Sequence, residues 1–111
     1  MSAHLTPAGA LATLAANAAG ATFVELFAHG SLAVELYKPV DRDLQAPHAR
    51  DEVYVVIAGT GIFVCGDARH AFGPGSLLWV PAGMAHRFEH FSDDFSTWVL
   101  FYGPQGGEHD A

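Results

Sequence analysis

Two histidines and a glutamate are the residues of this chain whose types and positions best fit a metal centre. His48 and Glu52 lie four residues apart, just before an apolar run over 53–57, and His86 follows a turn-rich stretch. Imidazole nitrogen and carboxylate oxygen suit iron, manganese, nickel, copper and zinc, and two histidines with one carboxylate are typical of non-haem Fe(II). These three residues are therefore our candidate ligands for one divalent transition metal per chain (Fe, Mn, Ni, Cu or Zn).

The spacing between His48 and Glu52 requires a bend. Four residues of regular strand span ~13 Å, so both side chains reach one ion only if the chain turns between them. The polar residues of segment 49–51 permit such a turn. Within it, Arg50 is either a solvated turn residue or a clamp for a substrate carboxylate.

His90 and Tyr54 are the candidate catalytic residues. If a regular strand covers 86–90, His90 lies ~13 Å from His86, and it then lines the same cavity without binding the same ion. Strand alternation also turns Tyr54 inward together with Glu52. Either side chain could act as the base that moves a proton.

The residues around His86 resemble the second motif of the cupin superfamily of small β-barrels. That motif is a glycine, five residues, Pro-x-Gly, two residues and a ligand histidine, and it is matched by Gly75, Pro81, Gly83 and His86. The resemblance implies an all-β fold, a cupin-type antiparallel β-barrel of the double-stranded β-helix or jelly-roll kind.

The first motif of that family is matched in part. His48, Glu52 and Gly59 fit its second histidine, its glutamate and its last glycine. The first histidine falls on Ala46 and the leading glycine on Val40. The resemblance therefore implies a metal site with three protein ligands, in which a water molecule or the substrate occupies the place that Ala46 leaves.

The elements that must position these residues are one short N-terminal helix and a series of short strands. Thr6-Pro7 is typical of a helix start and Gly20 of a helix end, which predicts a helix over 7–19. After it, short apolar runs separated by turn residues predict a β-sandwich or β-barrel. The expected strands cover 22–28, 31–38, 52–58, 61–65, 69–72, 77–80, 86–91 and 96–103.

The composition indicates one globular domain, with 111 residues of which 50% are hydrophobic and 15% charged. We expect a helical segment over 1–20, the barrel over 21–104 and a frayed tail over 105–111. The run 53–57 is apolar at every position, so both faces of its strand should be buried. Its outer face should lie either under the N-terminal helix or in a subunit interface, and a homodimer is expected because small domains are marginally stable alone.

The net charge excludes several classes of partner. Five Lys and Arg against twelve Asp and Glu give −7, the wrong sign for nucleic acid or an anionic membrane surface. The single cysteine, Cys65, allows no intramolecular disulfide, and no apolar run reaches the ~18 residues of a membrane helix. We expect a cytoplasmic protein whose partners are a small molecule and a second copy of the chain.

Two functions fit these residues. The first is a metal-dependent enzyme, a dioxygenase or an isomerase, that acts on a small oxygen-bearing organic molecule at the two-histidine, one-carboxylate centre. The alternative is a non-catalytic cupin that binds a sugar-like or apolar ligand without a functional metal. Ala46, and the lack of a second catalytic carboxylate near the motifs, favour this alternative.

Overall fold

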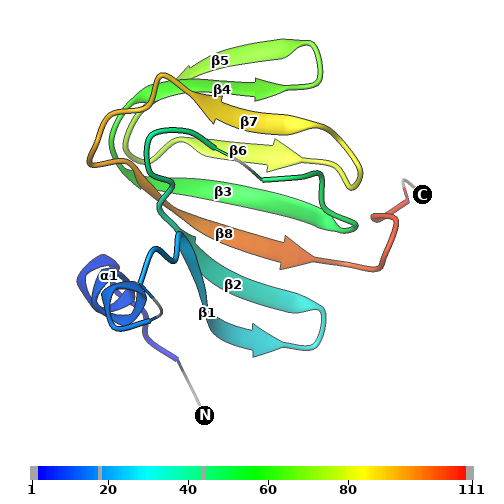
Figure 1. Ribbon diagram of the computed structural model, residues 1–111. Coiled ribbons are helices and arrows are strands. Elements are labelled where there is room, and N and C mark those ends of the chain that lie inside the picture. The colour runs from blue at the N-terminus through cyan, green and yellow to red at the C-terminus, as the bar shows by residue number, and fades with distance from the viewer. Residues whose placement is uncertain (1–2, 18, 44, 110–111) are drawn as a thin grey trace.

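The computed structural model describes residues 3–17, 19–43 and 45–109. It confirms an all-β fold with one short N-terminal helix (Figure 1). In chain order the elements are α1 (Pro7–Ala15), β1 (Phe23–His29), β2 (Leu32–Tyr37), β3 (Asp51–Ala58), β4 (Gly61–Cys65), β5 (Ala68–Phe72), β6 (Leu77–Val80), β7 (His86–Glu89) and β8 (Ser96–Tyr102). Each strand begins and ends within two residues of its predicted limits.

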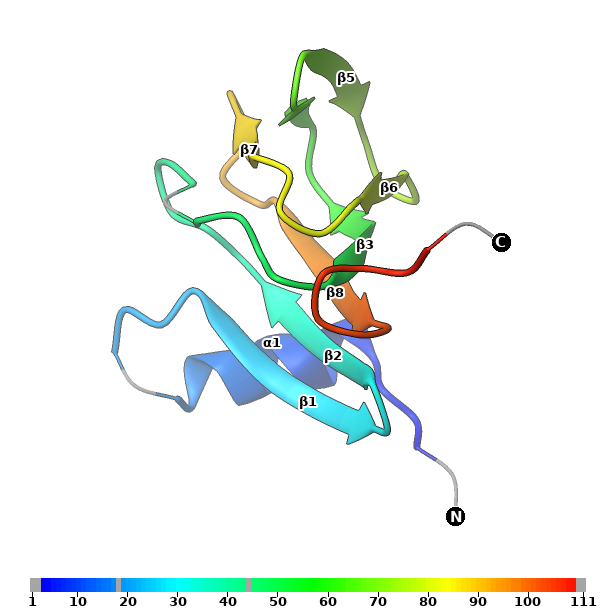
Figure 2. The same cartoon turned by 90° about the vertical axis from the view of Figure 1, so that its right-hand side faces the viewer.

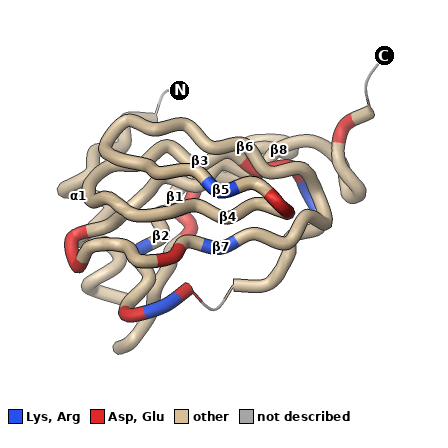
Figure 3. Tube along the Cα trace, turned by 90° about the horizontal axis from the view of Figure 1, so that it is seen from above, with Lys and Arg blue, Asp and Glu red and all other residues tan. Residues whose placement is uncertain are grey.

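The strands form two antiparallel sheets that do not close into one continuous barrel. The five-stranded sheet has the order β1-β2-β8-β3-β6, and the three-stranded sheet has the order β5-β4-β7. The three-stranded sheet lies over the end of the larger sheet that carries β3 and β6, and β1 and β2 lie at the far end (Figures 1 and 2). Arg69 on β5 and Arg87 on β7, the blue segments of these strands in Figure 3, both pair with Glu89.

The N-terminal helix begins where the sequence predicts but ends four residues early, at Ala15. The Thr6 hydroxyl accepts a hydrogen bond of 3.1 Å from the Gly9 N–H and caps the first turn. Ala10 and Leu14 are the helix residues buried against β1 and β2. The buried part of the helix ends with Leu14, and Gly20 (φ +81°) reverses the chain later, in the turn before β1. Among the described residues no helix is long and apolar enough to cross a membrane.

Two apolar clusters stabilise the fold. The larger one fills the space between the sheets and is rich in aromatic rings, among them Tyr54, Phe63 and Phe88. The smaller one lies under α1 and includes Ile57 and Trp98 from the outer face of the large sheet. At Ile57, the outer face of the run 53–57 therefore lies under the N-terminal helix, which is one of the two arrangements expected from the sequence.

The C-terminal segment is held in place up to Glu108, so the expectation of a tail frayed from residue 105 is wrong for the described residues. The Gly106 N–H donates to the Ala49 carbonyl at 2.7 Å, and the Glu108 N–H donates to the Asp51 carboxylate at 2.8 Å. Gly107 is buried between them. The physical reason is that Asp51, at the start of β3, can accept several backbone hydrogen bonds. Residues 110–111 of the predicted tail lie outside the described residues.

Candidate metal centre

The fold brings His48, Glu52 and His86 together from the loop before β3, from β3 and from the first residue of β7. One ligand atom of each lies within 4.8 Å of the others. The His86 Nε2 atom is 2.9 Å from Glu52 Oε1, and His48 Nε2 is 3.9 Å from the same oxygen. The bend required between His48 and Glu52 lies at residues 49–50, and β3 begins immediately after it.

The turn before β7 connects the two halves of the site. The Gly83 N–H donates to the His48 carbonyl at 2.7 Å, so the Pro-x-Gly turn is attached to the loop that carries the other histidine. Gly83 has a φ of +78°, which glycine adopts far more readily than other residues. On its other side, His86 pairs with Cys65 of β4. The glycine and proline of the motif thus place the His86 ring at the edge of the three-stranded sheet, facing Glu52.

The tautomer of His86 follows from its contacts. Its Nδ1 atom is 2.8 Å from the Met84 carbonyl, which can only accept, so Nδ1 carries the proton. In the neutral ring, Nε2 then presents its lone pair to the site, as metal-binding histidines do. Burial alone would lower the pKa of His86, but the adjacent Glu52 carboxylate and the Met84 carbonyl outweigh it and raise that pKa.

Glu52 carries the strongest indication of a missing cation. Its side chain is 1% exposed, and neither carboxylate oxygen accepts a hydrogen bond from the described part of the chain. The His86 Nε2 atom lies 2.9 Å from Oε1, and it pairs with this charge only when His86 is protonated. A buried carboxylate without such partners is unfavourable, and a divalent ion would satisfy both this charge and the lone pair of His86. The residues present therefore fit a transition metal.

Tyr54 lies against the same histidine. Its hydroxyl oxygen is 3.1 Å from His86 Nε2 and 3.0 Å from Gln45 Oε1. Burial and then the charge of Glu52 raise the pKa of Tyr54 well above 10.0. At neutral pH this side chain is consequently a hydrogen-bond donor, and the role of base that we considered from the sequence would require it to lose a firmly held proton.

His90 does not lie with the metal centre, so the expectation that it lines the same cavity is wrong. β7 ends at Glu89, and His90 has a left-handed backbone with a φ of +53°. This conformation ends the strand alternation on which the expectation depended. The exposed side chain of His90 borders a different depression, together with Asp41 and Arg42.

A cavity of about 380 Å³ reaches the centre from the His48 side. The side chain of His48 is 35% exposed, whereas that of His86 is 0% exposed, so among the described residues His48 is the ligand that faces the cavity. Ala46 lies in the wall, and the place of the missing motif histidine therefore opens into this cavity. Its lining consists of Phe23, Glu35, Tyr37, Gln45, Ala46, His48, Val99 and Phe101.

Glu35 is a carboxylate at the site that the sequence reasoning missed. It pairs with Val99 on β8, and Val99 pairs with Tyr54 on β3, so Glu35 and Tyr54 lie on one face of the sheet, two strands or about 10 Å apart. Burial raises the pKa of Glu35, and the charges of Glu25 and Glu52 add to this. The sequence does give one signal for Glu35: each of the expected apolar strands 22–28 and 31–38 contains a single glutamate. The structure pairs these two residues, Glu25 and Glu35, directly, which is unfavourable for like charges.

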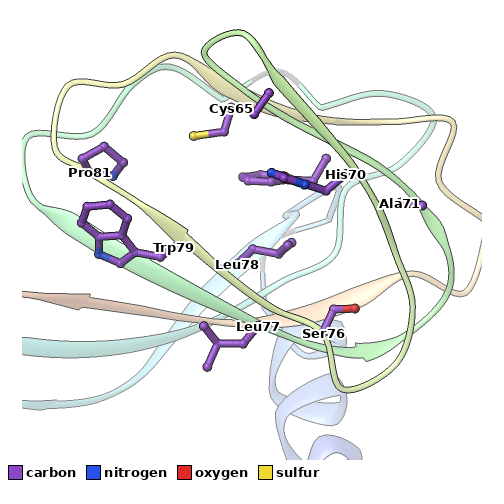
Figure 4. A pocket seen from close by; sticks show the side chains of 10 residues that line it. Cys65, His70, Ala71, Ser76, Leu77, Leu78, Trp79 and Pro81 are labelled. Atoms are coloured by element: carbon purple, nitrogen blue, oxygen red, sulfur yellow. The ribbon is translucent and has the colours of Figure 1, made fainter.

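Arg50 and a second groove lie away from the metal centre. The Arg50 Nε donates to the Gly103 carbonyl at 3.1 Å, so this part of its guanidinium holds the C-terminal segment. A groove of about 480 Å³ between β5 and β6 is lined by Cys65, His70 and Trp79, among others, and by none of the three candidate ligands (Figure 4). Burial raises the pKa of the Cys65 thiol, which makes it a poor nucleophile.

Similar proteins are found both by sequence and by structure. An uncharacterized protein of Streptomyces coelicolor, SCO3923, is 43% identical over 63 residues, which are 57% of this chain and 60% of that protein. The DMSP lyase DddQ of Ruegeria pomeroyi has a TM-score of 0.60 at 24% identity, over 73% of this chain and 46% of DddQ. KdgF of Halomonas has a TM-score of 0.64 at 15% identity, over 75% and 78% of the two chains.

The chain thus spans less than two thirds of SCO3923 and of DddQ, and the two structural similarities show the fold alone. The sequence also matches the model of the cupin domain over residues 33–102. This match contains the three candidate ligands, all but the first residue of β2, and the strands from β3 to β8. Because it covers more than half of the chain, the protein belongs to the cupin family.

Proposed function

We propose that this protein is a metal-dependent enzyme that moves a proton on a small oxygen-bearing organic molecule, an isomerase-type reaction. The observation that carries this proposal is the cavity beside the centre. His48 and Glu35 line the same cavity, so a molecule bound there can contact the metal centre and a carboxylate at once. A non-catalytic cupin would be favoured by the lack of a second carboxylate, and Glu35 supplies such a carboxylate in this cavity.

His48, Glu52 and His86 would hold one divalent ion (Fe, Mn, Ni, Cu or Zn). When bound, such an ion supplies Lewis-acid polarisation of a carbonyl or hydroxyl oxygen of the substrate. The Nδ1 hydrogen bond from His86 to the Met84 carbonyl fixes the ring so that Nε2 faces inward. Glu52 contributes the single negative charge of the set and is shielded from water.

Glu35 is the group that would accept and return the proton. A carboxyl group with a raised pKa is a better general base near neutral pH than an exposed one. Glu35 would take the proton from the C–H bond next to the carbonyl of an α-hydroxy carbonyl substrate, and the electron pair of that bond would form an enediolate. Glu35 would then return this proton to the former carbonyl carbon, while the hydroxyl proton moves to the former carbonyl oxygen. Phe23 and Phe101 form apolar walls of the cavity.

Isomerase-type chemistry is preferred to the dioxygenase alternative because it uses Glu35, whereas a dioxygenase needs open metal positions and O₂. The fold of the chain is shared with a protein named as a lyase, DddQ, which supports a catalytic role for this type of barrel. A non-catalytic binding role is favoured by one observation. The Gln45 carboxamide oxygen already contacts His48 Nε2 at 3.2 Å, so part of the site is satisfied without an ion.

Elemental analysis after expression in metal-supplemented medium tests the first step. We expect close to one transition-metal ion per chain in the wild type and none in His86→Ala, and a metal-free wild type would overturn the proposal. In the loaded protein, Glu35→Gln should keep the metal and lose the exchange of substrate C–H for deuterium in D₂O, measured over a panel of hydroxy-ketones and sugars. Stabilisation by organic ligands that is insensitive to chelator would support the binding role instead.

The homodimer and the cytoplasmic location also stay proposals. Light scattering after size exclusion tests the first, with twice the mass of one chain as the expected result. Fractionation of cells that express the tagged protein tests the second.

A further inference from the structure

We propose that Gln45 is a fourth protein ligand of the metal centre, with its carboxamide oxygen in the role of the histidine that is missing at Ala46. The inference rests on the proposed metal-dependent function and goes beyond its three-ligand site. It replaces the water molecule or substrate that the sequence places in the vacated position.

The position of the Gln45 oxygen is the first argument. Oε1 lies 3.2 Å from His48 Nε2 and 3.0 Å from the Tyr54 hydroxyl, which in turn is 3.1 Å from His86 Nε2. Atoms that share one ion at about 2.1 Å lie roughly 3.0–3.4 Å from one another. The separation of Gln45 Oε1 from His48 Nε2 is therefore the one expected for two ligands of the same ion.

The orientation of the carboxamide is the second argument. Its nitrogen, Nε2, donates to Asp43 Oδ2 at 2.8 Å, and a carboxylate of this kind only accepts hydrogen bonds. The nitrogen must therefore face Asp43, and the oxygen must face His48 and Tyr54. This assignment follows from the chemistry of the partners and does not depend on distinguishing the two atoms by their positions alone.

Asp43 is itself firmly held. It accepts a hydrogen bond from the Tyr37 hydroxyl of β2 at 2.5 Å and one from the Phe88 N–H of β7 at 2.9 Å. It also accepts from the Gln45 backbone N–H at 3.1 Å. The carboxylate thus attaches the loop to both sheets and fixes the direction of the Gln45 side chain, which makes Asp43 a positioning residue for the proposed ligand.

The chemistry of the resulting donor set is consistent. Two imidazole nitrogens, one carboxylate oxygen and one neutral amide oxygen suit Fe²⁺, Mn²⁺ or Zn²⁺ better than a soft ion such as Cu⁺. Gln45 adds a ligand without adding a second negative charge, which would repel the buried Glu52 carboxylate. Because Gln45 and His48 both line the cavity, the remaining metal positions face the bound molecule.

Zn²⁺ affinity, measured by competition with a chelating dye, tests the proposal. Gln45→Met keeps a side chain of similar length without an oxygen. We expect it to weaken Zn²⁺ binding by at least about tenfold, because the loss of a residue that only contacts a metal ligand already lowers metal affinity by about that factor. Gln105→Met, in the exposed C-terminal turn, is the matched control and should bind as the wild type does. Adding Ala46→His to Gln45→Met should restore the affinity.

The side-chain amide signals provide an independent readout, because Gln45 and Gln105 are the only two glutamines of the chain. On addition of Zn²⁺, the Gln45 NH₂ signals should shift and those of Gln105 should not. Wild-type affinity in Gln45→Met, or loss of affinity without a shift of the Gln45 signals, would overturn the ligand role and leave the proposed function standing. A wild type that binds no Zn²⁺ and no other divalent metal would overturn both.

Discussion

Replacing Glu52 by glutamine should stabilise the metal-free protein and abolish its metal binding. Glu52 is 0% exposed, and neither of its oxygens accepts a hydrogen bond within the described residues. Glutamine has nearly the same shape and no charge, and its NH₂ group can donate to the lone pair of His86 Nε2. The buried charge is thereby removed and a hydrogen bond is gained.

The size of the effect follows from the burial. An unsatisfied buried polar group costs about 1–3 kcal/mol, and a charged one costs more. For a domain of this length, 1 kcal/mol corresponds to roughly 4 °C in Tm. We therefore expect the Tm of metal-free Glu52→Gln to exceed that of the metal-free wild type by about 4–12 °C.

Thermal unfolding followed by circular dichroism, first with EDTA and then with excess Zn²⁺, measures both consequences. Zn²⁺ at about 100 times its Kd stabilises the wild type by about 2.7 kcal/mol, and it should leave Glu52→Gln unchanged. Glu89→Gln is the control, because this carboxylate lies at the surface between Arg69 and Arg87. Its loss should change the stability by no more than about 1 kcal/mol.

A lower Tm of Glu52→Gln than of the wild type, both in EDTA, would refute the reasoning. It would mean that the carboxylate is well paired in the metal-free protein, with protonated His86 as the partner. The raised pKa of His86 is consistent with such a pair. A paired Glu52 predicts a lower Tm for Glu52→Gln and an unpaired Glu52 predicts a higher one, so the sign of the change in Tm distinguishes the two.

Two further predictions concern positions outside the metal centre. Hydrogen bonds from the backbone N–H of Glu108 and then of Ala82 lower the pKa of Asp51 from 3.8. The stability that the Asp51 carboxylate contributes is therefore present above about pH 4 and is lost as the pH falls through the lowered pKa of the folded protein. Urea unfolding of wild type and Asp51→Asn should therefore differ at pH 7, and the difference should shrink as the pH is lowered through the folded pKa of Asp51; a difference that stays the same throughout acid titration would exclude this linkage. Gly59→Ala should destabilise the fold by about 1–3 kcal/mol, because φ is +94° and the new Cβ would lie 2.5 Å from the Phe95 Cα. Gly75→Ala, with φ +85° but nothing within 4 Å, should lose less in the same denaturation assay, and equal losses would show that the contact with Phe95 does not matter.

Much of the fold follows from local chemistry that the sequence displays. Short apolar runs between turn residues located all eight strands, because strand length and turn residues are local properties. Thr6 located the start of the helix for the same reason. The end of the helix was misplaced, because it depends on which side chains pack on β1 and β2, and Gly20 serves the following turn instead.

The strand face of His90 was also misjudged. Its position was inferred from an alternation that holds only while the backbone stays extended, and His90 leaves the strand with a φ of +53°. The C-terminal segment shows a similar limit. Its glycines and polar residues suggested fraying, but the Asp51 carboxylate, 57 residues away along the chain from Glu108, holds it.

For the candidate site, the sequence by itself determined the residues with metal-binding chemistry: His48, Glu52 and His86 are recognisable from their types, their spacing and the Gly-Pro-Gly turn. Only the tertiary structure decided what surrounds them. Glu35 reaches the cavity through the pairing of β2 with β8 and of β8 with β3, and Gln45 faces the centre because Asp43 is fixed by both sheets. The strand pairing that places Glu35 joins residues that are distant along the chain, and the direction of Gln45 depends on a side-chain orientation. A local sequence pattern encodes neither the pairing nor the orientation.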